Sequence, residues 1–207
     1  MKVTQVEKVS KTRSKVYLDG EFAFVLYKGE LRLYHVREGE EFSEQDYRTI
    51  LEKVLPKRAK LRAMNLLQKR AYTVEELRRK LRQGYYPASV IEKALSYVAA
   101  YRYTDDVRYA EDYIAGYAES RSRRRIEQDL MAKGISKDTL AKAWQNWQDK
   151  GGVQDEQTQI GILLQKRHYD PESADRKEQQ RTYAFLMRKG FSGEAVRRAL
   201  RAEEYFE

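Results

Sequence analysis

The chain has 207 residues, of which 41 are Lys or Arg and 32 are Asp or Glu, so its formal net charge is +9 at pH 7. Its 16 Tyr, 6 Phe and 2 Trp give it apolar surface that a disordered basic tail lacks, and we therefore expect a folded protein. The absence of Cys excludes disulfides, thiol catalysis and Cys-ligated metals, and the positive charge favours a polyanionic partner.

The first residues predict a small β-rich unit with one helix, over residues 1–56. The pair Asp19-Gly20 separates two β-prone runs and supplies the positive φ angles that a type I′ hairpin turn requires. Gly29 gives a weaker turn signal within the same unit. Ser43, with an acidic residue three positions later, predicts the start of the helix.

After Pro56, which we expect to open a new helix, the sequence repeats three times. Four apolar positions of the first copy recur 49 residues later and again after a further 56 residues. The glycines Gly84, Gly134 and Gly190 follow the middle helix of each copy, as expected of left-handed residues that end helices. The recurring positions are Leu77, Leu81, Ile91 and Leu95, then Ile126, Leu130, Leu140 and Trp144, then Thr182, Leu186, Val196 and Leu200.

Each copy reads as a three-helix unit, because a further helix precedes each pair, at 57–70, 105–119 and about 155–167. We predict a mainly α protein: an elongated tandem array of three three-helix repeats after the β-rich unit. Single units of about 50 residues bury little core, so neighbours are expected to share apolar faces. Gly151-Gly152 reads as a flexible break between the second and third copies. The predicted repeats are 57–104, 105–152 and 153–207.

Basic residues gather in three places. Residues 57–82 carry ten Lys or Arg against two Glu, and residues 121–125 place four Arg at the start of a helix, where they oppose the helix dipole. A third, weaker group consists of Arg176, Lys177, Arg181, Arg188 and Lys189. We expect these clusters to form a shared binding surface, the alternative being a solvated face. The candidate partner-binding or nucleic-acid-binding residues are Lys69, Arg70, Arg78, Arg79, Arg82, Arg121, Arg123, Arg124, Arg125, Arg188 and Lys189.

Three tyrosines beside the first basic cluster, Tyr72, Tyr85 and Tyr86, have two interpretations. They can stack on bases, but tyrosines at helix ends more often pack and keep a solvated hydroxyl. Thr73 and Glu76 form a predicted capping box.

The sequence predicts no enzyme. It carries none of the common phosphate-loop, zinc-protease or nucleophile-elbow motifs. His35 and His168 lie in unrelated contexts, and Asp105-Asp106 is interpreted as a helix cap in preference to a metal site. We expect no catalytic residue, no metal site and no cofactor.

Four stretches resemble the RecX family, regulators of the bacterial RecA recombinase. They keep the family's order and together span about residues 57–200. One departure is at 120–123, where many members have a Gly-Pro entry to the helix. The stretches are RAYTVEELRRKL at 70–81, YTDDVRYA at 103–110, RRIEQDLMAKGI at 124–135 and FLMRKGFS at 185–192.

The resemblance implies repeats that lie in the groove of the RecA–single-stranded-DNA filament, suppress ATP hydrolysis and strand exchange, and limit filament growth. It carries over no catalytic residue and leaves direct contact with DNA open. We expect a cytoplasmic monomer without a membrane segment, because the sequence has neither a signal-like apolar run nor 18 consecutive apolar residues. The alternatives are a sequence-nonspecific nucleic-acid-binding module and a scaffold for an unrelated protein partner.

Overall fold

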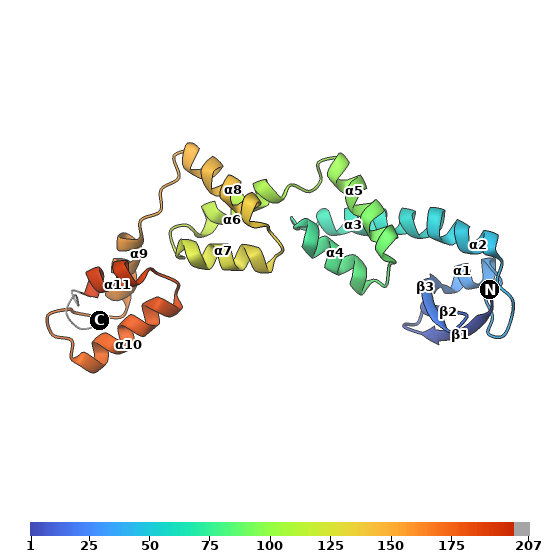
Figure 1. Ribbon diagram of the computed structural model, residues 1–207, viewed down its shortest axis with the longest axis horizontal. Coiled ribbons are helices and arrows are strands. Elements are labelled where there is room, and N and C mark those ends of the chain that lie inside the picture. The colour runs from blue at the N-terminus through green and yellow to red at the C-terminus, as the bar shows by residue number, and fades with distance from the viewer. Residues whose placement is uncertain (201–207) are drawn as a thin grey trace. The chain divides into compact units, whose positions relative to one another are not determined.

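The computed structural model describes residues 1–200 and divides into two compact units, one formed by Met1–Asp105 and one that begins at Asp106 (Figure 1). The predicted class is confirmed: a small antiparallel sheet is followed by three-helix repeats. The division lies next to the boundary expected between the first two repeats, and the other expected boundaries stay predictions. The part of the third repeat predicted over 201–207 lies outside the described residues.

Unit 1 begins with a three-stranded sheet in the order β1 (Val3–Lys8), β2 (Arg13–Leu18), β3 (Glu21–Tyr27). The expected hairpin turn is confirmed, because Asp19 and Gly20 join β2 to β3 with φ angles of 51° and 89°. Alternate residues of β2 are buried, which gives the sheet one face toward the core. The weaker turn signal at Gly29 is wrong: this residue lies inside the helix α1 (Lys28–Leu33).

A continuous helical run follows Ser43, whose hydroxyl accepts a hydrogen bond from the Asp46 amide. It consists of α2 (Glu44–Thr49), the π-helical segment η1 (Ile50–Val54) and α3 (Leu55–Leu67). Pro56 lies in the first turn of α3, as expected, but α3 continues directly from η1 without a break. The wider π turn, in which the Leu55 amide donates to the Ile50 carbonyl, lets the chain pass a proline that would otherwise clash with the preceding turn.

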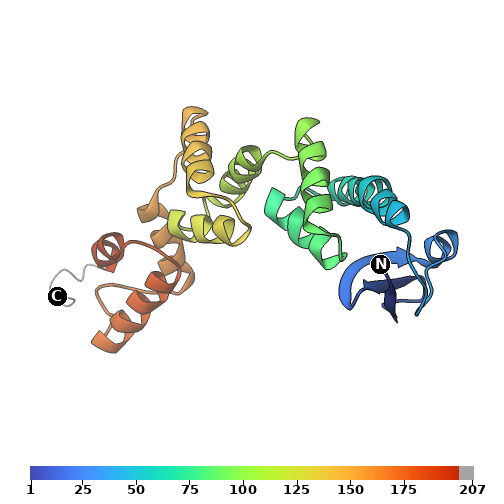
Figure 2. The same cartoon turned by 45° about the vertical axis from the view of Figure 1, so that its right-hand side comes forward.

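Three helices make up each repeat, and in each the first packs against the third (Figure 2). The twelve recurring positions are all buried, so the predicted register is confirmed. Thr73 and Glu76 form the expected capping box, with hydrogen bonds of 3.1 and 3.2 Å. The helices are α3, α4 (Val74–Gln83) and α5 (Ala88–Ala100), then α6 (Asp106–Tyr117), α7 (Arg123–Ala132) and α8 (Lys137–Asp149), then α9 (Glu156–Lys166), α10 (Arg176–Arg188) and α11 (Gly193–Leu200).

The middle helix of each repeat ends in a left-handed residue, but in the first repeat that residue is Tyr85 and not Gly84. Tyr85 has φ 63°, against 89° for Gly134 and 88° for Gly190, whereas Gly84 has φ −80°. Tyr85 therefore lies 49 residues before Gly134, in register with the apolar positions, whereas Gly84 is one residue out of register. In all three places the next residue donates its amide to the leucine four positions before the left-handed residue, which completes a Schellman motif.

The apolar cores do not follow the expected sharing between neighbouring repeats. The sheet and the first repeat have one common core, while the second and third repeats each enclose their own. Within unit 2, polar contacts join the two repeats. The side-chain amide of Gln159, buried on α9, donates to the carbonyl oxygens of Ala118 and Arg121, and Gln154 donates to the same two oxygens.

Gly151-Gly152, predicted as a flexible break between two repeats, forms a helix end. The Gly151 amide donates to Gln148 O at 2.8 Å and the Gly152 amide to Trp147 O at 3.0 Å, so the pair forms the Schellman end of α8. A Cβ at Gly152 would lie 2.3 Å from the Trp147 ring, so only glycine permits this contact. In residues 1–200 no helix is long and apolar enough to cross a membrane.

Candidate partner and nucleic-acid interface

Among the candidate residues of the first basic cluster, in unit 1, Arg78 has structural contacts. Arg78 on α4 bonds the Glu92 carboxylate through Nε at 2.9 Å and Nη2 at 3.1 Å, and Glu75 through Nη1 at 2.7 Å. These bonds lower the pKa of Glu92, chiefly through the Arg78 hydrogen bond. Because two carboxylates surround its guanidinium, Arg78 joins α4 to α5 and offers little charge to a partner.

The other candidate cations of this cluster lie nearer the solvent. Arg70 stacks on the Tyr72 ring at 3.6 Å and pairs with Glu76 at 3.5 Å. Tyr72 is buried, which favours the packing interpretation, whereas Tyr85 is exposed beside Phe22 at 6.4 Å between ring centroids. The side chains of three further candidates are exposed: Lys69, Arg79 and Arg82.

The second cluster, in unit 2, lies where the link after α6 enters α7. Arg121 stacks on Tyr117 at 3.9 Å and donates to Asp129 Oδ2 at 2.7 Å and to the Tyr113 hydroxyl at 2.8 Å. Arg125 pairs with the other oxygen of Asp129 at 3.1 Å. Burial raises the pKa of Tyr113, and the Asp129 carboxylate raises it further, so the phenol stays neutral beside these two arginines.

The remaining arginines of this cluster extend from α7 in other directions than Arg125. Arg123 bonds Glu127 at 2.9 Å and lies over the Trp144 ring at 4.7 Å. Arg124 is exposed to solvent. The three arginines of the first turn of α7 therefore do not point at one partner surface, because the helix turns each side chain by about 100° from the last.

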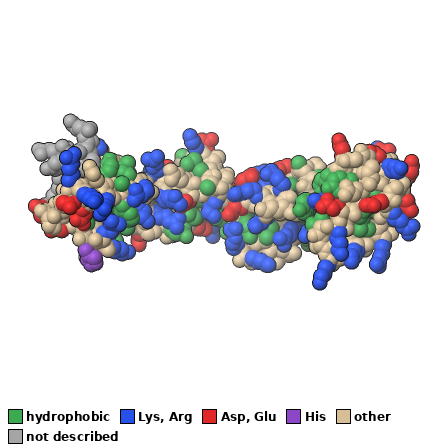
Figure 3. Space-filling model, turned by 90° about the horizontal axis from the view of Figure 1, so that it is seen from below, with side chains coloured by type: hydrophobic (Ala, Val, Ile, Leu, Met, Phe, Trp, Pro, Cys, Tyr) green, Lys and Arg blue, Asp and Glu red, His purple; other side chains and the backbone are tan. Residues whose placement is uncertain are grey.

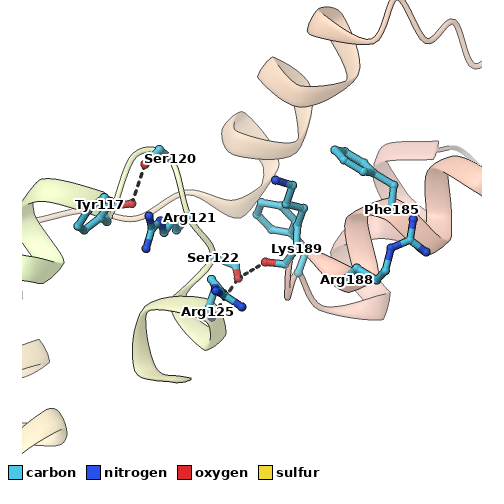
Figure 4. Close-up of a pocket in the computed structure, with 9 residues that line it drawn as sticks. Tyr117, Ser120, Arg121, Ser122, Arg125, Phe185, Arg188 and Lys189 are labelled. Carbon is cyan, nitrogen blue, oxygen red and sulfur yellow. Dashed lines mark hydrogen bonds between the residues drawn. The ribbon is translucent and has the colours of Figure 1, made fainter. Parts of the chain in front are cut away.

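The structure brings the second and third clusters together in a pocket of unit 2 with a volume of about 530 Å³. Arg121 and Arg125 line it from the α6–α7 side, and Arg188 and Lys189 line it from the end of α10 (Figure 4). Its nine lining residues include no carboxylate. Figure 3 shows that Lys and Arg side chains are spread over the whole of one face of the molecule, this unit included.

A buried serine fixes the two sides of this pocket, which we call the inter-repeat pocket. The Ser122 hydroxyl donates to the Lys189 carbonyl at 2.9 Å and accepts from the Arg125 amide at 3.3 Å, so it also caps α7. Gly190 permits this approach, because a Cβ there would lie 2.7 Å from Ser122 Oγ. The pocket geometry therefore depends on a helix cap and a left-handed glycine from two different repeats.

Sequence reasoning identified the four cations of the pocket and missed the residues that assemble it. A serine before an apolar-periodic helix signals a cap for Ser122, but not its second bond to a residue far along the chain. The rings of Tyr117 and Phe185 lie against the cations of Arg121 and Lys189, and no sequence pattern predicted these contacts. Gln154 and Gln159 are ordinary polar residues in the sequence.

The histidines have a backbone explanation. His35 and His168 have φ angles of 50° and 54° and each follows the end of a helix, α1 or α9, as its left-handed residue. Asp106 begins α6, as the helix-start interpretation requires. Among residues 1–200 no three His, Cys, Asp or Glu side chains gather in a way that could hold a metal ion.

All three repeats match known domain models. The first three-helix domain of RecX matches residues 59–97, the second matches 105–143 and the third matches 154–200, and together these ranges cover more than half of the chain. The chain belongs to the RecX family. The order of the three RecX domains is the order of the three repeats described above.

Relatives from several bacteria extend the similarity over nearly the whole chain. The regulatory protein RecX of Clostridium beijerinckii is 26% identical over 95% of this chain and 92% of its own length. That of Caldanaerobacter subterraneus subsp. tengcongensis is 25% identical, covering 97% and 98%. That of Bacillus velezensis is 27% identical, covering 96% of this chain and 75% of the relative.

Two crystal structures share the fold. One, of a regulatory protein RecX, has a TM-score of 0.60 at 23% identity and covers 98% of this chain and 99% of that one. The other, of RecX from Lactobacillus salivarius, has a TM-score of 0.56 at 21% identity and covers 74% and 99%. The first match covers nearly the whole chain, so that structure shares the N-terminal sheet as well as the three repeats.

Proposed function

We propose that this protein regulates the RecA recombinase, mainly as an inhibitor, by binding the RecA filament on single-stranded DNA. The observation that carries the proposal is the match of all three RecX domains, in order, to the three repeats. The protein acts as a cytoplasmic monomer, without catalysis and without a cofactor. By lying in the filament groove it suppresses ATP hydrolysis and strand exchange and limits filament growth.

The basic residues supply the contacts. Cations spread over successive repeats give many modest interactions along an extended partner, so affinity arises by multivalency without one deep apolar pocket. The contributing residues are the exposed cations of both units, together with the inter-repeat pocket. Arg78 contributes least, because its guanidinium already bonds Glu75 and Glu92.

Arg124 is the arginine of α7 whose substitution best tests binding to the filament. Reversing Arg123 or Arg125 would break ion pairs with Glu127 and Asp129 and confuse folding with binding. Arg124→Glu reverses an exposed charge on the same helix turn and should weaken filament inhibition while helicity is unchanged. Lys142→Glu, an exposed cation on α8 of the same repeat, is the matched control and should inhibit as the wild type does. Equal inhibition by Arg124→Glu and the wild type would remove Arg124 from the interface.

The proposal itself is tested by the single-stranded-DNA-dependent ATPase of the cognate RecA, titrated with this protein. Loss of ATPase at substoichiometric protein that persists in excess DNA is the expected result. It would mean that the filament, and not the bare DNA, is the target. No loss of ATPase at any ratio would contradict the proposal and leave the family and fold unchanged.

A sequence-nonspecific nucleic-acid-binding module is the second candidate, favoured by the four cations that gather around one pocket. It predicts tight binding to bare DNA that weakens steeply with salt, because each neutralised phosphate releases counterions. It also predicts that excess DNA restores the RecA ATPase, since the protein would then only sequester DNA.

A further inference from the structure

The inter-repeat pocket has more positive charge than its surroundings neutralise. Arg121, Arg125, Arg188 and Lys189 line it, and Asp129 is the carboxylate that pairs with two of them from behind, outside the lining. One carboxylate shared by two guanidiniums leaves each with donors that it does not use, because a guanidinium has five N–H groups. The pocket thus combines several donors with a local charge surplus.

Part of this donor set is held in place before any ligand arrives. The Arg121 side chain is fixed by Asp129, by the Tyr113 hydroxyl and by stacking on Tyr117, as described above. On the opposite side, Lys189 lies over the Phe185 ring at 5.5 Å. Donors that are already oriented lose little side-chain entropy when a ligand binds, which favours affinity.

A neighbouring hollow between the same two repeats serves as an internal comparison. It is lined by Arg123 and Arg124 but also by Glu127 and Glu156, so its charges balance. The repeats therefore do not place unbalanced cations at every junction surface. The surplus in the inter-repeat pocket is therefore not shared by this neighbouring hollow, and it favours an anionic ligand.

The chemistry of the lining favours phosphate over carboxylate. A carboxylate has two oxygens in one plane, and those of Asp129 are satisfied here by one contact from each of two arginines. A tetrahedral phosphate offers oxygens in several directions, so it can accept bonds from α7 and from α10 at the same time. The volume of about 530 Å³ is within the range of small-molecule pockets and accommodates a nucleotide unit.

We propose that the inter-repeat pocket is a phosphate-binding site that takes a phosphodiester of a nucleic-acid backbone or the phosphates of a free nucleotide. This inference deepens the proposed function and rests on it for the biological partner, but the binding chemistry is tested without RecA. Arg188 and Lys189 on one side and Arg125 on the other bind the phosphate oxygens, and Arg121 supplies fixed positive charge.

The experiment compares two double variants of α10 in the full-length protein. R188Q/K189Q removes the two pocket cations at the end of α10, and R176Q/K177Q removes an equivalent Arg-Lys pair from the first turn of the same helix. Both change the net charge equally, and neither alters the Ser122 bond, which uses the Lys189 backbone. Fluorescence anisotropy with a short labelled oligothymidylate measures affinity across a salt series, and circular dichroism confirms that both variants fold.

We expect R188Q/K189Q to weaken oligonucleotide binding by roughly tenfold or more, as the loss of charge-assisted hydrogen bonds implies. Its salt dependence should also flatten by about 1 on a log–log plot. R176Q/K177Q should change both quantities much less. Equal losses of affinity in the two variants would mean that the oligonucleotide responds to the overall positive charge, which would contradict a phosphate site in the pocket. A wild-type protein that does not bind the oligonucleotide would contradict it as well.

Competition separates the possible ligands. Pyrophosphate that displaces the oligonucleotide from the wild type, while polyglutamate does not, supports a phosphate site. Displacement by polyglutamate at an equal charge concentration would overturn the assignment in favour of acidic protein segments. ATP that raises the Tm of the wild type but not of R188Q/K189Q identifies free nucleotide as the source, whereas oligonucleotide binding without that effect identifies the nucleic-acid backbone.

The pocket and the proposed function can fail separately. If R188Q/K189Q loses oligonucleotide binding while the wild type has no effect on the RecA ATPase, the phosphate site stands and the regulatory proposal fails. If the wild type inhibits the RecA ATPase and R188Q/K189Q binds the oligonucleotide like the control variant, the regulatory proposal stands and the phosphate site fails.

Discussion

The hydroxyl of Ser122 donates a 2.9 Å hydrogen bond to the backbone carbonyl of Lys189, a residue 67 positions later in the chain. Ser122 is only 1% exposed, and the same oxygen accepts the Arg125 amide that opens α7. One small side chain thus caps a helix of the second repeat and joins it to the third. The two repeats lack a common apolar core, so such polar contacts carry their association.

Ser122→Ala should destabilise unit 2 by about 2 kcal/mol, because it removes a helix cap and leaves a carbonyl without its partner. Ser136→Ala is the matched control, since Ser136 caps α8 through the Thr139 amide and is exposed. It should cost about 1 kcal/mol. Both tryptophans of the chain lie in α8, so their fluorescence during urea unfolding reports unit 2. Equal losses in the two variants would show that the bond to Lys189 adds nothing.

Gly190→Ala should disturb the same junction from the other side. An alanine there must adopt φ near 88° and would place its Cβ 2.7 Å from Ser122 Oγ. Gly151→Ala has the same φ of 88° and no atom within 4 Å of the added Cβ. We therefore expect Gly151→Ala to cost about 1–2 kcal/mol from backbone strain alone, and Gly190→Ala to cost clearly more. Chemical unfolding of both variants separates the cost of backbone strain from the cost of the steric clash. Similar losses of unfolding free energy would contradict the close approach of Gly190 to Ser122.

What the sequence could predict were the features that depend on neighbouring residues. The Asp19-Gly20 turn, the Thr73 capping box and the buried positions such as Leu81 and Leu130 follow from local geometry and from helical periodicity. Tyr85 is different, because glycine is the usual left-handed residue and Gly84 stands directly before it. Only the backbone φ angles show that Tyr85, and not Gly84, is the left-handed residue after α4.

The candidate site was predictable in composition and not in arrangement. Sequence clustering identified Arg121, Arg125, Arg188 and Lys189, but their meeting depends on how two repeats pack. Nor could spacing reveal that Arg78 is bound by Glu92, which lies on the next helix. Charge runs report where cations occur along the chain, whereas the carboxylates that neutralise them come from elements packed alongside.

Gly84 and Gly116 should respond to alanine in opposite directions. At Gly84 an added Cβ would lie 2.9 Å from Tyr86 Cε2 and 3.0 Å from the Leu81 carbonyl oxygen, so Gly84→Ala should destabilise unit 1. At Gly116, inside α6, the added Cβ meets nothing within 4 Å. Gly116→Ala should therefore stabilise unit 2 by about 0.5–1 kcal/mol, because glycine has the higher chain entropy when unfolded. Thermal unfolding followed by circular dichroism measures both, and a destabilising Gly116→Ala would contradict the open space around that residue.

The pairing of Glu111 with α8 should make the second repeat sensitive to acid. The Glu111 carboxylate accepts bonds from Lys150 Nζ and Asn146 Nδ2, both at 2.5 Å, and its side chain is 14% exposed. The Lys150 hydrogen bond, followed by that from Asn146, lowers the pKa of Glu111 below its ordinary value of 4.5. A group whose pKa is lower in the folded state contributes stability above its unfolded pKa and loses it as the pH falls through the folded pKa.

Glu111→Gln should accordingly reduce the free energy of unfolding at pH 7 by about 1–2 kcal/mol and have little effect well below pH 4.5, where the wild type has lost the same contribution. Asp112→Asn, at an exposed carboxylate one residue further along α6, is the control and should leave the pH dependence of the wild type unchanged. Urea unfolding at a series of pH values, followed by tryptophan fluorescence, gives the difference curve. A constant difference between Glu111→Gln and the wild type from neutral to acid pH would contradict the role of the charged carboxylate, because an uncharged contact does not titrate.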